Sequence, residues 1–241
     1  MRPLRLLCSA VVLATGFALP ASAATLTLSA QNGSTVFGTN GSAGATILET
    51  TIRPAGLRVS AGGFAVKGDL NGNGVENFTA WCVDIATRLR LPSNYTTTTS
   101  PFTTGLFSAT TLSNIERLFE TGLSTLNLAN NAQSAGFQLA LWEVLYEKSG
   151  TFNLGVGNFK VSYSAAAIAA GQALLNGMSG PITRNFDMTY LQSTDARGQG
   201  GPYSQNLVTA TVVPLPAAGI LLLGALGGLA ALRRRKTNLA A

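Results

Sequence analysis

Residues 131–148 read NAQSAGFQLALWEVLYEK, and this stretch gives the strongest helix signal in the chain. Apolar side chains and one lysine recur in it at the spacing of one helical face, namely Phe137, Leu141, Val144, Leu145 and Lys148. A capping box at 113–116 predicts a second helix that Gly122 ends. An Ala-rich segment, 164–176, predicts a third, so the middle of the chain is helical.

Segments with strand character lie on both sides of this helical middle. They are 25–29, 45–52, 57–68 and 77–88 before it, and 184–191 and 205–212 after it. In 77–88 the alternation places Trp81 and Cys82 on opposite faces. Residues 92–111 are read as a Thr-rich loop. Strands, then helices, then strands predict an α+β fold, an antiparallel β-sandwich or barrel with a helical insertion.

The N-terminal 23 residues have the pattern of a signal peptide. Arg2 and Arg5 precede an apolar run that ends near Leu19, and Ala21-Ser22-Ala23 then offers a small-x-small cleavage site after Ala23. An N-terminal membrane anchor is the alternative, which the shortness of the run disfavours. We therefore expect an exported domain at 24–211.

The C-terminal segment 212–241 carries a second address. A Pro-rich motif, an apolar run at 217–232 and a basic cluster at 233–236 follow one another, and the cluster predicts a cytoplasmic end. The motif Val-Pro-Leu-Pro-Ala at 213–217 resembles the VPLPA variant of the PEP-CTERM sorting signals. This resemblance implies recognition of Pro214 and Pro216 by an exosortase. It also implies transient anchoring of 217–232 in the inner membrane, and a final location at or outside the surface of a Gram-negative bacterium.

Charge and composition exclude several classes of function. The chain has 16 Lys and Arg against 10 Asp and Glu, but six of the basic residues lie in the two end segments, so the domain between them is neutral. Bulk charge therefore gives no support for a nucleic-acid partner. The absence of His excludes Ser-His and Cys-His catalytic pairs and His metal sites. Residues 69–76 open like a calcium loop, but position twelve is Ala80, so we read a hairpin turn and expect no cofactor.

Two residues stand out chemically. Cys8 leaves with the signal peptide, so Cys82 is the only cysteine of the exported domain. Gln138 lies on the apolar face that it shares with Leu141, Trp142 and Leu145, where a carboxamide needs hydrogen-bond partners. The residues alone leave two interpretations open. Either Gln138 bonds a sheet edge and Cys82 is a small buried side chain, or the carboxamide meets the cysteine.

The segments Trp81-Cys82-Val83 and 137–142 (FQLALW) resemble the paired motifs of bacterial thioester domains, known from Gram-positive surface adhesins. Those domains carry an aromatic-or-Leu-Cys motif on a strand and a hydrophobic-Gln-x-x-hydrophobic-Trp motif on a helix. The resemblance implies an internal thioester between Cys82 and Gln138. Such a bond would capture amines of a protein or polysaccharide on a partner surface once, without enzymatic turnover.

Further roles follow from this reading. We expect Trp142, one turn beyond Gln138, to shield the bond from water, and Asp84 and Glu143 are candidate proton carriers by position. The alternative function is a non-covalent structural protein of the bacterial surface or biofilm matrix, with no covalent chemistry. A conventional hydrolase is disfavoured by the lack of His and of a G-x-S-x-G elbow.

Overall fold

The computed structural model describes residues 25–31, 35–49, 56–99, 107–148, 150–180, 182–183, 185–195 and 204–213. The expected signal peptide with Ala23, the motif prolines Pro214 and Pro216, and the apolar run 217–232 lie outside these ranges. Within them, no helix combines the length and the apolar character needed to cross a membrane.

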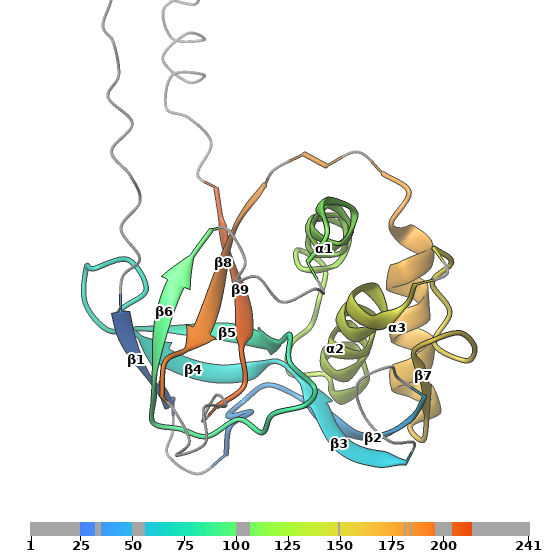
Figure 1. Ribbon diagram of the computed structural model, residues 1–241, viewed down its shortest axis with the longest axis horizontal. Coiled ribbons are helices and arrows are strands. Elements are labelled where there is room, and N and C mark those ends of the chain that lie inside the picture. Colours follow the sequence, from blue (N-terminus) through green and yellow to red (C-terminus); the bar gives the residue numbers. More distant parts are fainter. Residues whose placement is uncertain are drawn as a thin grey trace, which may run out of the picture.

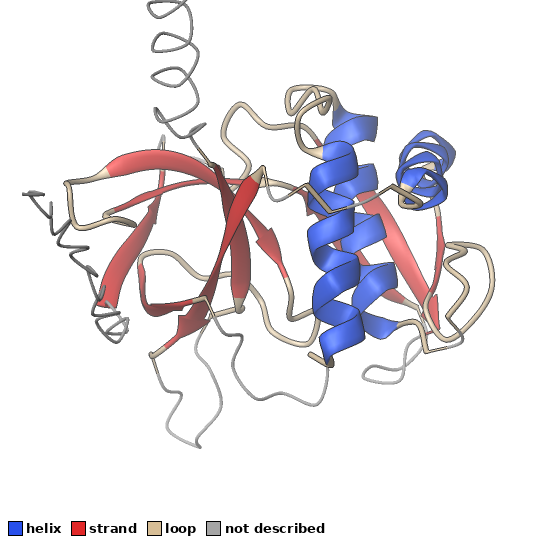
Figure 2. Cartoon of the chain, turned by 90° about the horizontal axis from the view of Figure 1, so that it is seen from above, coloured by secondary structure: helices blue, strands red, loops and turns tan. Residues whose placement is uncertain are grey.

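The described chain forms a closed antiparallel barrel beside a layer of helices and a small sheet (Figures 1 and 2). The barrel has the strand order β1-β4-β5-β9-β8-β6, and the small sheet has the order β3-β2-β7. This architecture confirms the predicted α+β class and selects the barrel over the sandwich. The barrel strands are β1 (Thr25–Ala30), β4 (Phe64–Gly68), β5 (Glu76–Cys82), β6 (Ser93–Thr98), β8 (Phe186–Ser193) and β9 (Leu207–Val212).

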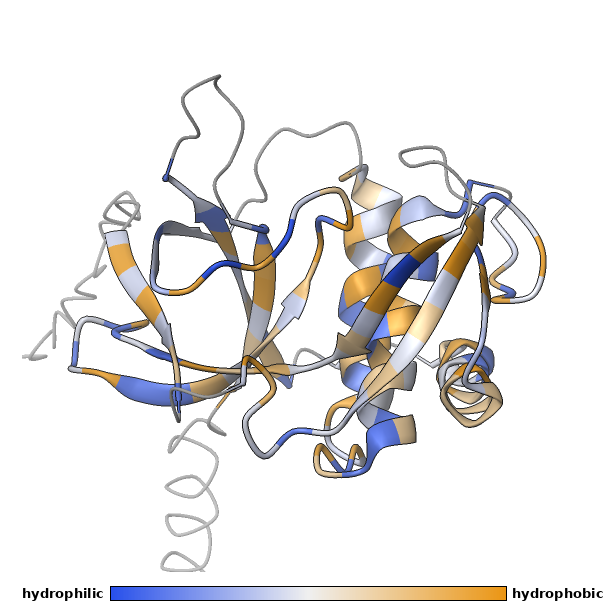
Figure 3. Cartoon of the chain, turned by 90° about the horizontal axis from the view of Figure 1, so that it is seen from below, coloured by the Kyte–Doolittle hydropathy of each residue, from blue (hydrophilic) through white to orange (hydrophobic). Residues whose placement is uncertain are grey.

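The remaining elements pack beside the barrel. They are β2 (Ser42–Glu49), β3 (Leu57–Gly62), β7 (Lys160–Ser162), α1 (Ala109–Gly122), α2 (Asn131–Tyr146) and α3 (Ala165–Gly177). In β1, hydrophobic and hydrophilic residues alternate, and Leu26 and Leu28 are buried in the core (Figure 3). The barrel interior is thereby filled with side chains.

Helix α2 is buried on every side from Ser134 to Tyr146. It packs against α1, α3, β2 and β3, and its backbone comes close to that of α3. A Cβ atom on Gly136 would lie 2.7 Å from the backbone nitrogen of Gly171, so these glycines permit the approach. The prediction of one apolar face was therefore too narrow, and Lys148 lies beyond the helix end and is exposed.

Several predicted boundaries were wrong. The strand expected at 77–88 ends at Cys82, and the expected strand 57–68 is two strands, β3 and β4, in different sheets. The Thr-rich loop at 92–111 contains β6, whose β-branched residues pair with β1 and β8. Helix α1 begins at Ala109, and its N-cap is Ser108, whose Oγ accepts from the Thr111 N–H, rather than Ser113. The short strand β7 was not predicted.

Candidate functional site

The end of β5 and the middle of α2 bring Cys82 and Gln138 together. The Cys82 N–H donates to Oε1 of Gln138 at 2.8 Å, and Nε2 of Gln138 donates to the Cys82 carbonyl at 2.9 Å. Only 1% of Gln138 and none of Cys82 is exposed. The carboxamide thus bonds a sheet edge, and the residue at that edge is the cysteine itself.

Topology explains why this edge is free for a side chain. Strand β4 covers one edge of β5 up to the pair Phe64–Ala80, beyond which the chain belongs to β3. On the other edge β9 continues, with Cys82 opposite Leu207 and the Val83 N–H donating to the Asn206 carbonyl at 3.1 Å. Gln138 therefore takes the place of a neighbouring strand at the last residue of β5.

Aromatic packing fixes the approach of the helix to the strand. The residue before Cys82 is Trp81 and the residue before Gln138 is Phe137, and their ring centroids lie 4.4 Å apart. Phe119 of α1 meets the Phe137 ring edge-to-face at 5.0 Å. Each motif therefore supplies one apolar residue that joins the two elements and one polar residue that faces its counterpart.

Two further side chains of α2 bond the main chain near the site, and sequence reasoning missed both. The Ser134 hydroxyl accepts from the Gly63 N–H at 3.0 Å. The Tyr146 hydroxyl donates to the Val83 carbonyl at 3.3 Å and accepts from the Ile85 N–H at 3.2 Å. With Gln138 and Trp142 these residues recur every four positions, and that spacing was the available signal.

The environment of Cys82 disfavours its thiolate. Burial raises the pKa of the Cys82 thiol to about 12, while the Asp84 backbone N–H lowers it, the Asp84 charge raises it and the Trp142 indole N–H lowers it. The Trp142 nitrogen is nevertheless buried without a hydrogen bond of normal geometry to any described residue. The Trp142 indole N–H thus lowers the pKa of the thiol, but no hydrogen bond joins it to the sulfur.

The arrangement suits attack of sulfur on the carboxamide in one respect that the distances show. When a thiolate adds to the carbonyl carbon of Gln138, negative charge develops on Oε1. That oxygen already accepts from the Cys82 N–H at 2.8 Å, which is the geometry of an oxyanion-stabilising donor.

The two predicted proton carriers have other contacts. Oδ1 of Asp84 accepts from the Ala86 N–H at 3.0 Å within a turn. Oε1 of Glu143 accepts from the Asn153 N–H at 2.6 Å, in the segment that follows α2. Burial raises the pKa of Glu143 to about 7, against the lowering effect of the Asn153 N–H and with a raising effect from Glu147. Their role as proton carriers stays a prediction.

The pKa values of two buried tyrosines, Tyr95 and Tyr146, depend on the charge of Cys82. Burial raises the pKa of Tyr95 to about 12, where its bond to Ser204 opposes the rise and negative charge on Cys82 adds to it. Burial raises the pKa of Tyr146 as well, and negative charge on Cys82 is the next cause. Sequence reasoning missed both phenols as neighbours of the thiol.

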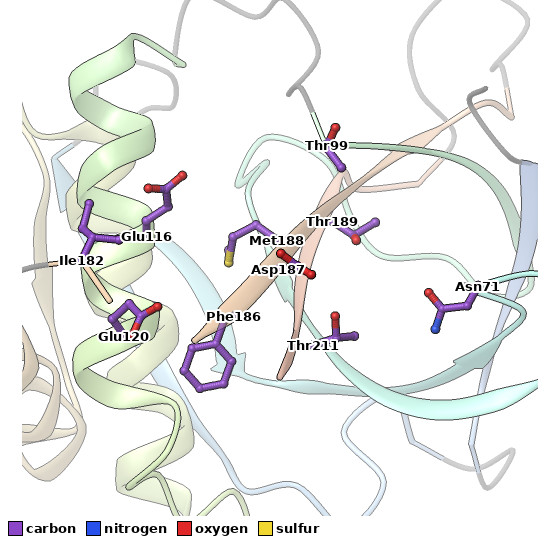
Figure 4. A pocket seen from close by; sticks show the side chains of 10 residues that line it. All are labelled: Asn71, Thr99, Glu116, Glu120, Ile182, Phe186, Asp187, Met188, Thr189 and Thr211. Atoms are coloured by element: carbon purple, nitrogen blue, oxygen red, sulfur yellow. The ribbon is translucent and has the colours of Figure 1, made fainter. Parts of the chain in front are cut away.

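A separate cavity of about 600 Å³ lies between α1, the first half of β8 and the C-terminal end of β9 (Figure 4). Three of its lining side chains are the acids Glu116, Glu120 and Asp187. Neither Cys82 nor Gln138 lines it. The part of the chain that the structure describes contains no group of three or more His, Cys, Asp or Glu residues that could hold a metal.

Comparison with known proteins gave solved structures only. No family model and no curated protein matches the chain. The N-terminal domain of the Streptococcus pyogenes pilus tip adhesin Cpa shares 13% identity, over 71% of this chain and 93% of that one, with a TM-score of 0.40. The N-terminal thioester domain of a Clostridium perfringens surface protein shares 16% identity, over 62% of this chain and 89% of that one, with a TM-score of 0.42.

The chain is thus similar, at low identity, to one domain of a pilus tip adhesin and one domain of a surface protein. The function proposed below rests on the contacts of Cys82 and Gln138 and on the motifs that contain them.

Proposed function

We propose that the protein is an exported, adhesin-type surface protein in which Cys82 and Gln138 form an internal thioester that captures an amine on a partner surface. One observation carries this proposal. The Gln138 carboxamide is held at two points against Cys82, the only cysteine of the expected exported domain. The paired motifs around the two residues support the same chemistry.

Formation of the bond needs no added reactant. The Cys82 sulfur attacks the carbonyl carbon of Gln138, the C–N bond breaks, and ammonia leaves with the thiol proton. Holding the two residues in contact replaces part of the barrier by proximity. Burial opposes the reaction by raising the pKa of the thiol, and the oxyanion donor from the Cys82 N–H acts in its favour.

Capture reverses the roles. An amine attacks the same carbon, the C–S bond breaks, and the product is an amide to Gln138 with a free Cys82 thiol. Each molecule reacts once, so the protein is not an enzyme in this role. The buried site protects the thioester from water until a partner amine reaches it.

Location is part of the proposal. The signal peptide 1–23 directs export, and the 212–241 segment directs anchoring through 217–232 and exosortase processing at the motif that contains Pro214 and Pro216. The partners are amines of protein or polysaccharide at the cell surface or in a matrix. Measuring the mature termini of the native protein by mass spectrometry tests this processing.

The test of the thioester is a tryptic map of the purified protein, kept at mildly acidic pH and free of amines. Trypsin releases Cys82 in peptide 68–88 and Gln138 in peptide 118–148. We expect the two peptides to be joined, with a combined mass lighter by one ammonia. Treatment with methylamine is expected to separate them and add one methylamine to 118–148 after loss of ammonia.

Three variants control this measurement. Cys82→Ala and Gln138→Ala must abolish the joined species, whereas Gln133→Ala, at a partly exposed glutamine of the same helix, must retain it. Two full-mass peptides with a free thiol would contradict the proposal. They would favour the non-covalent structural role, in which the two hydrogen bonds of Gln138 simply join helix to strand.

A further inference from the structure

One face of α2 carries four polar groups at four-residue spacing, and one of them lacks a partner. Ser134 bonds Gly63, Gln138 bonds Cys82, and Tyr146 bonds Val83 and Ile85. Trp142 stands between the last two, only 3% exposed, and its indole nitrogen has no hydrogen bond within the described structure. Buried donors are almost always paired, so this one calls for a physical explanation.

The contacts on either side confine the indole. Gln138, one turn before Trp142, is fixed to Cys82, and Tyr146, one turn after it, is fixed to Val83 and Ile85. The ring is therefore held over the segment that begins at the reactive cysteine. The Cys82 sulfur belongs to that segment, and it is the acceptor there whose charge changes during the proposed reaction. The same N–H lowers the pKa of the thiol.

We propose that Trp142 is a catalytic residue of the thioester, whose indole N–H bonds the Cys82 sulfur whenever that sulfur carries negative charge. This goes beyond shielding, and its kinetic part rests on the proposed function. The N–H stabilises sulfur as it attacks Gln138. It does so again when an amine attacks the carbonyl carbon, the C–S bond breaks and the electron pair passes to sulfur. The amine's proton finally rests on the thiol.

The unpaired state of the donor fits this role. A thiol or thioester sulfur is a poor acceptor, whereas a thiolate is a strong one. The N–H therefore gains its partner mainly as charge develops, so it stabilises the transition state more than the resting bond. A donor already satisfied by a backbone carbonyl would give no such difference.

The contact itself can be tested without any thioester. The chain has two tryptophans, so two indole N–H signals are expected in a ¹⁵N–¹H spectrum, and Trp142→Phe assigns them. Relative to the wild type, we expect the Trp142 signal to move downfield in Cys82→Ser, which offers a stronger acceptor, and to move less in Cys82→Ala, which offers none. An unchanged Trp142 signal in both variants would overturn the proposal.

The kinetic test separates a donor from a shield by the sign of the effect. Trp142→Phe keeps an aromatic ring but removes the N–H, so we expect cleavage by methylamine to slow about tenfold. A residue that only shields would give an equal or faster rate in this variant, and that result would overturn the proposal. Gln133→Ala changes a residue of the same helix that bonds Asn127 rather than the site, and it is expected to stay within about twofold of wild type.

The two arms distinguish failure of this proposal from failure of the thioester. A chain without joined peptides contradicts the proposed function and removes the catalytic role of Trp142, while the indole signals still report whether its N–H faces the sulfur. A chain that forms the thioester but shows unchanged signals or unslowed cleavage overturns the role of Trp142 alone.

Discussion

Gln138 directs both ends of its carboxamide to one residue, and this contact has a structural value separate from any chemistry. It pairs a buried N–H and a buried carbonyl of Cys82 that no strand reaches. An unpaired buried backbone group costs about 1–3 kcal/mol. The same side chain is thus both the proposed acyl group and a fastener between α2 and β5.

A comparison of two alanine variants separates these roles. Neither Cys82→Ala nor Gln138→Ala can form a thioester, but only the second leaves the Cys82 backbone unpaired. We expect Gln138→Ala to be less stable than Cys82→Ala by about 2 kcal/mol in urea unfolding at equal pH. Equal stability of the two variants would show that the paired hydrogen bonds contribute little.

The raised pKa of Glu143 is expected to make the free energy of unfolding fall as the pH rises. Burial raises its pKa to about 7 from an ordinary value of 4.5, so the folded state keeps a proton that the unfolded state has lost. Between these values, raising the pH favours the unfolded state, and the free energy of unfolding must fall. We expect this fall between about pH 4.5 and 7 in the wild type and a flatter profile in Glu143→Gln. Parallel profiles would contradict the assignment.

At the scale of elements, α1 shows how a cap is misread. Ser113 and Glu116 have the spacing of a capping box, but the helix begins at Ala109, four residues before Ser113. Its N-cap is Ser108, whose side chain accepts from the Thr111 N–H. The capping-box residues 113–116 lie inside α1, so they do not cap its N-terminus.

Replacing each serine tests which one caps the helix. Ser108→Ala leaves a first-turn N–H unpaired, and we expect a loss of about 1 kcal/mol in unfolding free energy. Ser113→Ala is the matched control and is expected to change stability by less than about 0.5 kcal/mol. A larger loss for Ser113→Ala would restore the capping box.

Helix α2 and strand β6 show which elements can be predicted from the sequence and which cannot. Helix α2 was predicted with its start correct, because its apolar pattern is long and Asn130 caps it through two N–H groups. Strand β6 was missed because SNYTTT has no apolar alternation. Its stability comes from pairing with β1 and β8, which are distant in sequence.

The residues of the site likewise fall into those that the sequence singled out and those that it missed. The motif pair singled out Cys82 and Gln138, because two distinctive residue types in a fixed order carry that information. The structure places the Gln138 carboxamide on the Cys82 main chain, and the bond between the two side chains stays a prediction. Ser134 and Tyr146 were missed because a serine and a tyrosine in a helix look like ordinary packing. Only the path of β5 beside α2 shows which backbone groups they bond.

For the whole molecule, the proposed thioester would join the barrel to the helical layer. Its two residues are 56 positions apart, and a cross-link that closes a loop of this length restricts the unfolded chain by about 4 kcal/mol in the loop-entropy model. We expect methylamine treatment to lower the unfolding free energy of the wild type by up to this amount. Cys82→Ala is the control and must be unaffected by methylamine.

The burial of Cys82 and Gln138 has a consequence for the speed of capture. An amine can reach the Gln138 carbonyl carbon only while β5 and α2 are transiently separated. Local opening therefore becomes a kinetic step that precedes the attack of the amine on the thioester. The observed rate should then rise with amine concentration and level off at the opening rate. A partner that binds and separates β5 from α2 would raise the plateau rate. The choice among amines would then depend on which partner can separate the two elements, and less on how nucleophilic its amine is.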